Sequence, residues 1–296
     1  MSMPIETIIE QSSVVSGQLS VDDAETLANG GFYWRERDGI KVLVCRALED
    51  AGFVNGFSTR VGGVSSFPDN SLNLAGFDDD TAENIFENRR RFLALFDGDL
   101  QLALAWQVHG DAIRTVANAE DVGDSELRAD AVMSNMRGVL AAVKTADCVP
   151  VLIGDPTSGA FVAVHAGWRG TAQSIVKEAV AEMHETYASN PSDMIAAIGP
   201  AATCKSYEIG REVIRDFENN LGRESEKYFS PTRVGHAYVD LHAANCDQLT
   251  EGGVAEQNIY VAPFCTMERG DLFFSYRREK QDFGKTGRLL SVIGRR

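Results

Sequence analysis

Cysteine is scarce in this chain, and the closely spaced pairs of a structural zinc site are missing. The five cysteines stand far apart, at Cys45, Cys148, Cys204, Cys246 and Cys265. No CxxC sequence occurs, which argues against a zinc knuckle. An odd number of widely spaced cysteines predicts free thiols in a reducing compartment, and not a disulfide framework.

Positive charge is also in short supply, with 28 Lys and Arg residues against 43 Asp and Glu and a net charge of −15. A strongly acidic surface repels nucleic acid and anionic membranes. The chain lacks an uninterrupted apolar run of about 18 residues, as a membrane span requires. Its N-terminus lacks the basic and apolar regions of a signal peptide. We therefore expect a cytoplasmic protein that binds neither nucleic acid nor a membrane.

Several well-known catalytic motifs are missing as well. There is no GxSxG, GxGxxG or HExxH sequence, and Gly284-Lys285-Thr286 lacks the earlier glycine of a P-loop, because Glu279 stands there. No internal repeat, low-complexity segment or linker divides the 296 residues. We therefore expect an N-terminal extension over residues 1–30 and a single catalytic domain over residues 31–296.

The hydrophobic pattern mixes helices and strands without a regular βαβ alternation, which favours an α+β fold. The predicted helices cover residues 21–28, 80–96, 171–187, 209–221 and 241–249. The predicted strands cover residues 32–34, 40–45, 102–108, 131–133, 139–143, 149–153, 160–164, 194–198 and 259–261.

Two of these strands organise the functional interpretation. The turn sequence GDPTSG at 154–159 joins strands 149–153 and 160–164, so we expect them to pair as antiparallel neighbours. Cys148 precedes the first strand and His165 follows the second, which places both at one edge of the sheet. A thiolate and an imidazole at that edge can bind a metal or form a nucleophile–base pair.

A third candidate, His109, ends the predicted strand 102–108 beside Gly110. Two imidazoles and one thiolate suit Zn²⁺ and leave a fourth position for water or substrate, as in catalytic zinc sites. Two alternatives stay open from the residues alone. Cys148 and His165 could act as a dyad without a metal, or Cys148 could be an ordinary buried thiol beside locally hydrogen-bonded histidines.

A series of short sequence blocks resembles one known family. The blocks are TRVGGVS at 59–65, SLNL at 71–74, QVHG at 107–110, KTADCVPVL at 144–152, HAGWRGT at 165–171, IGP at 198–200, FFSYRRE at 273–279 and TGR at 286–288. In this order they resemble the YfiH/laccase-domain family, once called multicopper polyphenol oxidases and now regarded as purine nucleoside phosphorylases. The resemblance spans residues 50–290.

The resemblance implies a fold and a metal site. The fold is a single α+β domain with mixed β-sheets in a sandwich-like core flanked by helices. The family's zinc ligands are the histidine of QVHG, the cysteine of ADC and the histidine of HAGW, which are His109, Cys148 and His165 here. In the family a cysteine pair often follows IGP, whereas this chain has AATCK at 201–205, so we expect a different pocket surface there.

The resemblance also implies phosphorolysis of adenosine, inosine, guanosine and methylthioadenosine to a free base and ribose 1-phosphate. Because arginine binds phosphate with two parallel hydrogen bonds, Arg60 and Arg169 are the first candidates for the phosphate site. The C-terminal arginines at 277, 278 and 288 are secondary candidates. Asn73 is a candidate for the pocket lining.

An adenosine deaminase activity, attributed to the family, fits a water molecule activated by zinc that attacks C6 of adenine. Asp147, next to the predicted cysteine ligand, is the candidate proton carrier, or else it orients a ligand histidine.

Other functions stay open beside this interpretation. The family's older name implies a copper-dependent polyphenol oxidase, with copper bound at least in vitro. The five histidines are too few for the clusters of a multicopper site. A Cys–His hydrolase and a non-enzymatic zinc-binding scaffold are the remaining alternatives. The sequence leaves the oligomeric state open.

Overall fold

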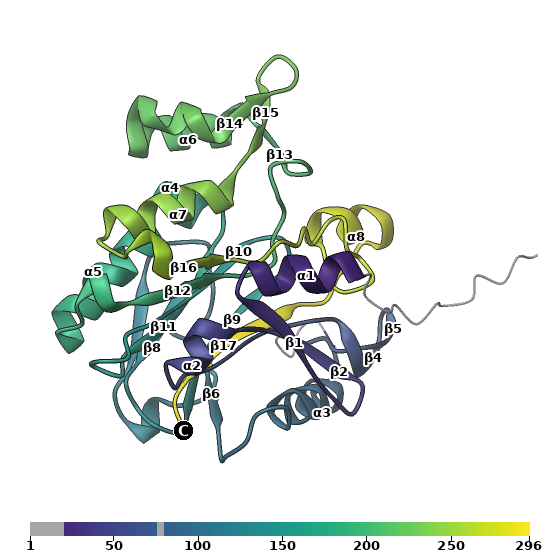
Figure 1. Ribbon diagram of the computed structural model, residues 1–296. Helices are drawn as coiled ribbons and strands as arrows, with labels where there is room; N and C mark the ends of the chain where they lie inside the picture. Colours follow the sequence, from purple (N-terminus) through teal and green to yellow (C-terminus); the bar gives the residue numbers. More distant parts are fainter. Residues whose placement is uncertain (1–20, 76–79) are drawn as a thin grey trace, which may run out of the picture.

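Two six-stranded β-sheets stacked face to face form the centre of the molecule (Figure 1). The computed structural model describes residues 21–75 and 80–296, so the first twenty residues of the predicted N-terminal extension lie outside it. The first sheet has the order β1 (Phe32–Arg37), β2 (Ile40–Cys45), β3 (Val54–Ser58), β17 (Leu289–Gly294), β9 (Val139–Thr145) and β6 (Gln101–Ala103). The second has the order β16 (Ile259–Val261), β12 (Ile195–Ile198), β10 (Val149–Gly154), β11 (Phe161–Ala166), β8 (Ala131–Ser134) and β7 (Ile113–Val116).

The alternation of side chains along the buried strands explains this stacking. In β10, Leu152 packs into the core between the sheets, whereas Val151 and Ile153 pack into a second core on the opposite face. Successive side chains of a strand point to opposite faces, so a strand that is apolar throughout is buried on both sides. Each fully buried side chain of this kind contributes about 1.5–3 kcal/mol relative to exposure.

Helices cover the two outer faces of the sandwich. On the first sheet, Phe92 of α3 (Ala82–Leu93) and the following Phe96 pack into a core with residues of β2, β9 and β17. On the second sheet, the covering helices are α5 (Ile175–Tyr187) and α7 (Leu241–Glu251). The shorter helices are α1 (Val21–Asn29), α2 (Arg46–Asp50), α4 (Trp168–Ala172) and α8 (Tyr276–Phe283). None of the helices in the described ranges is long and apolar enough to cross a bilayer.

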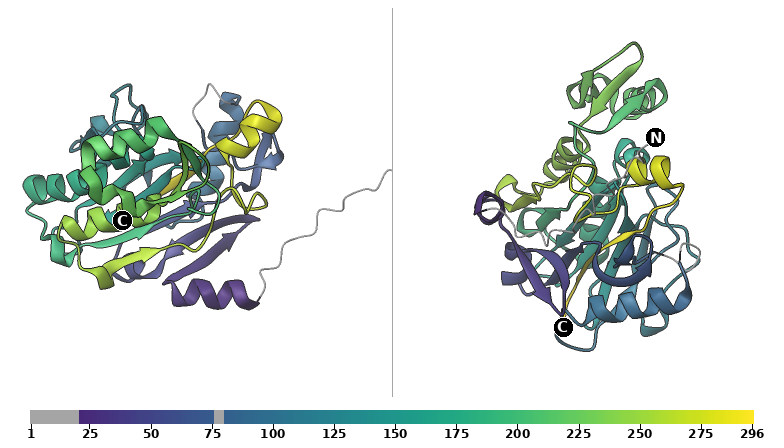
Figure 2. Two further views of the ribbon diagram at one scale, coloured as in Figure 1. Left: turned by 90° about the horizontal axis from the view of Figure 1, so that it is seen from above. Right: turned by 90° about the vertical axis from the view of Figure 1, so that its right-hand side faces the viewer.

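A small lobe projects from the sandwich on the side of the second sheet (Figure 2). It contains the three-stranded sheet of β13 (Glu208–Gly210), β15 (His236–Val239) and β14 (Phe229–Pro231), together with α6 (Arg211–Leu221). A separate two-stranded sheet pairs β4 (Val61–Ser66) with β5 (Asp69–Ser71). Both additions lie outside the two large sheets.

The structure confirms the α+β fold, and its sheets are mixed. β6 and β9, β7 and β8, and β12 and β16 pair in parallel, whereas the other pairs in the large sheets are antiparallel. The antiparallel pairing of β10 with β11 is also confirmed, with Pro150 opposite His165. Of the predicted N-terminal extension, Leu27 of α1 is buried in the core between the sheets.

Two sequence expectations about individual elements are wrong. The predicted strand 102–108 is a strand only over Gln101–Ala103. Beyond it Trp106 forms an isolated bridge with Arg128, and the side chain of Gln107 makes the contact with the end of β9. The predicted helix 171–187 is interrupted at Ser174, whose left-handed φ of +64° separates α4 from α5.

The turn between β10 and β11 depends on the buried carboxylate of Asp155. It accepts hydrogen bonds from the backbone N–H groups of Thr157 at 2.9 Å and Ser158 at 3.2 Å. Burial by itself would raise the pKa of Asp155, but the hydrogen bonds from Ser158 and Thr157 outweigh it and lower the pKa. A lowered pKa means that this stabilisation is present above the unfolded-state pKa of about 3.9 and is lost as pH falls through the folded-state value.

We expect Asp155→Ala to lower the free energy of unfolding by about 1–3 kcal/mol at neutral pH, because it leaves two amide N–H groups without acceptors. The difference from wild type should begin to shrink below about pH 4, where Asp155 of the unfolded chain becomes protonated, and should shrink further as pH falls toward the lower pKa of the folded state. Denaturant titrations from pH 7 to pH 3 measure it. Asp155→Asn, which keeps an acceptor oxygen, is the matched control. A loss that stays constant over this pH range would contradict the role assigned to the carboxylate.

Candidate metal centre

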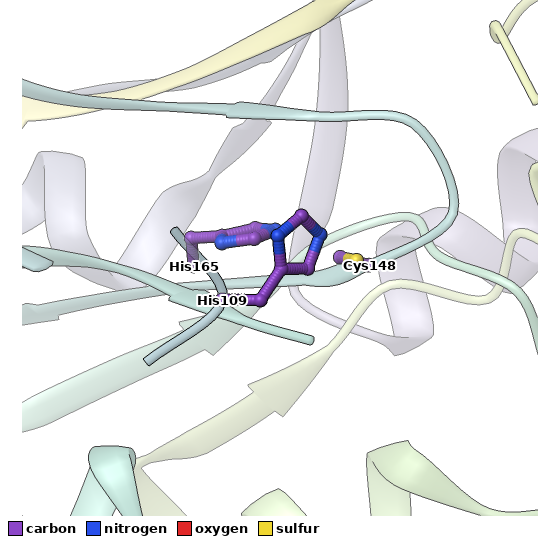
Figure 3. Close-up of side chains that lie close together, drawn as sticks. All are labelled: His109, Cys148 and His165. Carbon is purple, nitrogen blue, oxygen red and sulfur yellow. The ribbon is translucent and has the colours of Figure 1, made fainter. Parts of the chain in front are cut away.

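His109, Cys148 and His165 come together at one edge of the second sheet. One ligand atom from each lies within 4.8 Å of the others. The rings of the two histidines are 4.9 Å apart between centroids and nearly perpendicular, at 79°. Figure 3 shows both rings and the thiol turned toward one another. The three residues predicted from sequence therefore form one cluster.

The backbone around this cluster has an unusual conformation. His109 has a φ of +61° and Asp147, beside Cys148, a φ of +84°. Residues other than glycine seldom adopt such angles, and they occur mostly where the surrounding structure enforces them at functional sites. Gln107 helps to hold the loop at His109 in this conformation, because its side chain exchanges two hydrogen bonds of 2.8 Å with the backbone of Lys144.

Gly167 keeps the space between the ligands free. A Cβ atom at this position would lie 3.1 Å from Cδ2 of His109 and 3.2 Å from Sγ of Cys148. Both distances are tighter than ordinary van der Waals contact. The glycine of HAGW therefore lets the chain turn into α4 without displacing a ligand.

Asp130 is the residue that holds the cluster together. Its fully buried carboxylate lies 2.7 Å from Nδ1 of His165 and accepts the backbone N–H groups of Val108, His109 and Gly110 at 3.1, 2.9 and 2.8 Å. Burial alone would raise the pKa of Asp130, but the hydrogen bonds from His165 and Gly110 lower it overall. Since Nδ1 of His165 is engaged by Asp130, Nε2 is the nitrogen left to bind a metal.

The electrostatics of the cluster favour a thiolate. Burial by itself would raise the pKa of Cys148, but neighbouring His165 and the hydrogen bond with His109 lower it to about 6. A thiolate and two imidazole nitrogens are the donor types that zinc prefers, and three such ligands leave one position open. The residues present therefore fit a catalytic metal. They also include a third donor, His109, for which a Cys148–His165 dyad has no use.

The cluster faces a cavity of about 870 Å³. Four aromatic side chains line it, from the segment before His109, from α4, from the segment before β13 and from α8: Trp106, Trp168, Tyr207 and Tyr276. Trp106 and Tyr276 are each 49% exposed, so part of the aromatic surface is accessible from solvent. The cavity thus offers flat apolar faces beside the metal ligands.

Three arginines of the cavity each lie over one of these aromatic rings. The distance from the guanidinium carbon to the ring centroid is 4.3 Å for Arg169 over Trp168, 5.0 Å for Arg277 over Tyr207 and 5.7 Å for Arg288 over Tyr276. Across residues 21–75 and 80–296, none of the three forms an ion pair with a carboxylate. An acidic protein thus keeps three positive charges available around one cavity.

Asp147 lines the same cavity, but its carboxylate is already engaged. One oxygen accepts the hydroxyl of Thr266 at 2.7 Å, and the other accepts the hydroxyl of Ser275 at 3.0 Å and the backbone N–H of Arg277 at 2.7 Å. Burial, only partly offset by these bonds, raises the pKa of Asp147. None of these three partners is a histidine, and the carboxylate connects the residue before Cys148 to the start of α8.

Arg60 and Asn73 lie outside the residues that line the cavity. Arg60 donates to Glu279 at 2.6 Å and lies 4.6 Å from the ring centroid of Phe274, so its charge is neutralised inside the protein. Asn73 is buried, and its side-chain oxygen accepts the backbone N–H of Arg288 at 2.9 Å. Of the three predicted substrate-binding residues, only Arg169 reaches the cavity.

Sequence reasoning missed Asp130 and the aromatic residues of the cavity. A signal for Asp130 was present, because it directly precedes the apolar strand 131–133, and Ala131 pairs with Val164, the neighbour of His165. Tyr276 lies in the FFSYRRE block, which marked its segment but not its role, whereas no signal marks Tyr207, which lies just before the small lobe.

We expect Asp130→Asn to weaken metal binding by about 10–100-fold, because an amide cannot supply the charge that orients His165 and increases its basicity. Competition with a chelating dye measures this affinity. Asp111→Asn makes the same chemical change at a nearby exposed position and should leave the affinity unchanged. Equal affinities of Asp130→Asn and wild type would show that Asp130 does not act on the metal site.

The chain is similar to known proteins over most of its length. The family model described as multi-copper polyphenol oxidoreductase laccase matches residues 54–296. Purine nucleoside phosphorylase YlmD of Geobacillus stearothermophilus is 36% identical over 261 residues, which cover 86% of this chain and 94% of that protein. Purine nucleoside phosphorylase YfiH of Escherichia coli is 34% identical over 256 residues, which cover 86% of this chain and 98% of that protein.

The solved structures lead to the same family. The crystal structure of YlmD from Geobacillus stearothermophilus superimposes with a TM-score of 0.81 at 35% identity, covering 90% of this chain and 99% of that one. That of Bacillus licheniformis YfiH also reaches 0.81, at 31% identity, with coverages of 90% and 99%. The chain therefore belongs to the multi-copper polyphenol oxidoreductase laccase family, among whose members are the proteins named YfiH and YlmD.

Proposed function

We propose that this chain is a zinc-dependent purine nucleoside phosphorylase acting on adenosine, inosine, guanosine and methylthioadenosine. One observation carries the proposal: a single cavity combines the three metal ligands with aromatic faces and three arginines that lack carboxylate partners. A nucleoside and phosphate need such surfaces together, since the purine base binds to aromatic faces and the phosphate oxyanion to arginines. The relatives named purine nucleoside phosphorylases support this assignment. We further propose that the chain acts in the cytoplasm, where nucleosides and phosphate are available.

The size and chemistry of the cavity suit the two substrates. Its volume of about 870 Å³ is at the upper end of ordinary ligand pockets, with room for a nucleoside and phosphate together. The aromatic rings can stack against a purine. Arg169, Arg277 and Arg288 can bind a phosphate oxyanion through paired N–H groups, since each lies over a ring and none forms an ion pair with a carboxylate of the described residues.

The reaction replaces a C–N bond by a C–O bond. An oxygen of hydrogen phosphate bonds to C1′ of the ribose, and the bond from C1′ to N9 breaks. Its electron pair leaves with the purine, which takes up the proton that the phosphate gives up. The arginines hold the phosphate against the sugar, where positive charge develops as the base leaves. We assign the proton transfer to Asp147, because its carboxyl group lines the cavity beside Cys148 and burial raises its pKa.

Two further residues support this arrangement from outside the cavity. Arg60 binds Glu279 of α8, the helix that also carries Tyr276 and Arg277. Asn73 holds the backbone at Arg288. We therefore propose that both residues act by positioning the cavity arginines.

His109, Cys148 and His165 would hold a zinc ion, which would supply Lewis-acid chemistry for polarising a substrate oxygen or activating a water molecule. Three protein ligands leave one position open, and this is the observation that favours adenosine deamination as a second activity. Copper binding in vitro is compatible with the same donors. A polyphenol oxidase is the less favoured alternative, since the described residues contain one such ligand group and not several.

The direct test is incubation of the purified protein with inosine or adenosine, with and without phosphate. We expect free base and ribose 1-phosphate only when phosphate is present, and slower conversion of adenosine to inosine that does not require phosphate. Chromatography of the bases and an assay for ribose 1-phosphate measure both. Oxidation of a phenol that depends on added copper, without base release, would instead support the oxidase.

We expect about one zinc per chain, and His109→Ala, Cys148→Ser and His165→Ala should lose zinc and phosphorolysis together. Each change removes one of three ligands, and a neutral serine hydroxyl is a poor substitute for a thiolate. Elemental analysis and the same assay measure the two losses, and circular dichroism checks the fold. His184→Ala, on the outer helix α5, is the matched control. Normal turnover in His109→Ala beside an inactive Cys148→Ser would favour the dyad.

A further inference from the structure

A second cavity of about 480 Å³ adjoins the first on the side of the small lobe. The two cavities share four lining residues, which are two arginines and the aromatic residues beneath them: Trp168, Arg169, Tyr207 and Arg277. Arg288, the third arginine of the main cavity, does not line the smaller one. The shared residues therefore form a junction with two stacked guanidinium groups.

The other charged groups of the side cavity are one ion pair and the carboxylate of Glu212, which has no ion-pair partner among the described residues. Glu208 forms an ion pair of 3.0 Å with Arg233, so these two charges cancel locally. The carboxylate of Glu212 is turned toward the start of α6, where a Cβ atom on Gly210 would lie 2.6 Å from its Oε2. His236 places Nδ1 3.2 Å from the carbonyl oxygen of Val234.

The two junction arginines, by contrast, are fixed in place without being neutralised. Arg277 donates from Nη1 to the carbonyl oxygen of Glu208 at 2.8 Å, and its backbone N–H is held by Asp147. The guanidinium of Arg169 forms no hydrogen bond or ion pair within the described part of the chain, and it stacks on Trp168. Stacking covers the faces of a guanidinium and leaves its N–H edge free to bind an oxyanion.

We propose that inorganic phosphate binds at this junction, between Arg169 and Arg277, and reaches it through the side cavity. This inference rests on the proposed phosphorylase activity and specifies where its second substrate binds. With the nucleoside in the main cavity beside the aromatic rings, the side cavity provides a separate route for the second substrate. Phosphate at the junction borders the space that the sugar occupies and carries the charge that two unpaired arginines favour.

The first experiment measures binding of inorganic phosphate by calorimetry at constant ionic strength, without any turnover. We expect saturable binding to wild type and at least about 10-fold weaker binding to Arg169→Gln and to Arg277→Gln, since each loses a charge-assisted hydrogen-bond pair. Arg277→Lys should recover part of the affinity, because it restores the charge without the paired geometry. Zinc content and the unfolding midpoint check that the variants are folded.

Arg233→Gln is the matched control, because Arg233 lines the side cavity but is neutralised by Glu208. We expect it to change the phosphate affinity less than about 2-fold, as for an exposed ion pair. Wild-type affinity in both Arg169→Gln and Arg277→Gln would overturn the junction site. Absence of saturable binding to wild type would overturn it as well.

The second experiment repeats the titration with the protein saturated by a C-nucleoside, whose carbon–carbon glycosidic bond resists phosphorolysis. If phosphate enters through the side cavity, its affinity should stay within about 2-fold of that of the free protein, corresponding to less than about 0.5 kcal/mol. Abolished binding would overturn the separate route.

The two proposals can fail independently. Phosphate that binds wild type and is lost in the arginine variants, without any cleavage of nucleosides, would retain the junction site and reject the phosphorylase. Phosphate-dependent cleavage combined with unchanged phosphate affinity in Arg169→Gln and Arg277→Gln would reject the junction and retain the enzyme.

Discussion

The carboxylate of Asp130 is the interaction on which the functional site depends. It receives the imidazole of His165 and three successive backbone N–H groups, those of Val108, His109 and Gly110. One buried charge therefore fixes His165 of the second sheet and the irregular loop that carries His109, two of the three candidate metal ligands. A buried carboxylate with four donors is favourable, whereas the same group without them would be costly to bury. The left-handed conformation of His109 is maintained by this attachment.

The central part of the fold could be predicted from sequence because its signals are local. Strands such as 149–153 are apolar throughout and end at a Gly-Asp-Pro turn, which determines both the element and its antiparallel partner. The strands of the small lobe and β17 escaped prediction for the opposite reason, whereas the helix of the lobe, α6, matches the predicted helix 209–221. β17 pairs with β3 and β9, more than 140 residues away in the chain, and β13 and β14 contain only three residues each. Short strands whose partners are distant carry little pattern of their own.

The arginines of the candidate site could not be assigned from sequence for a similar reason, because their roles depend on partners that are distant in the chain. Arg60 stands beside two glycines and Arg169 follows a tryptophan, and both patterns are compatible with an anion site. The difference between the two arginines comes from Glu279, which lies more than 200 residues away from Arg60 in the chain and neutralises Arg60 inside the protein. Whether an arginine is available thus depends on the carboxylates that folding brings to it. The clustering of Cys148 with His165 was easier to predict, because the two residues flank a pair of strands joined by a short turn.

The family's older name and its relatives' current names suggest different chemistry, and the environment of the ligands favours the second. A multicopper oxidase needs several clusters of histidines, whereas the described chain places one group of three donors against a cavity. Arginines stacked on aromatic rings give no advantage to a neutral phenol, which carries no oxyanion to bind. They match a substrate pair consisting of a flat base and a phosphate. The charge around the ligands, more than the ligands themselves, thus discriminates between the two chemistries.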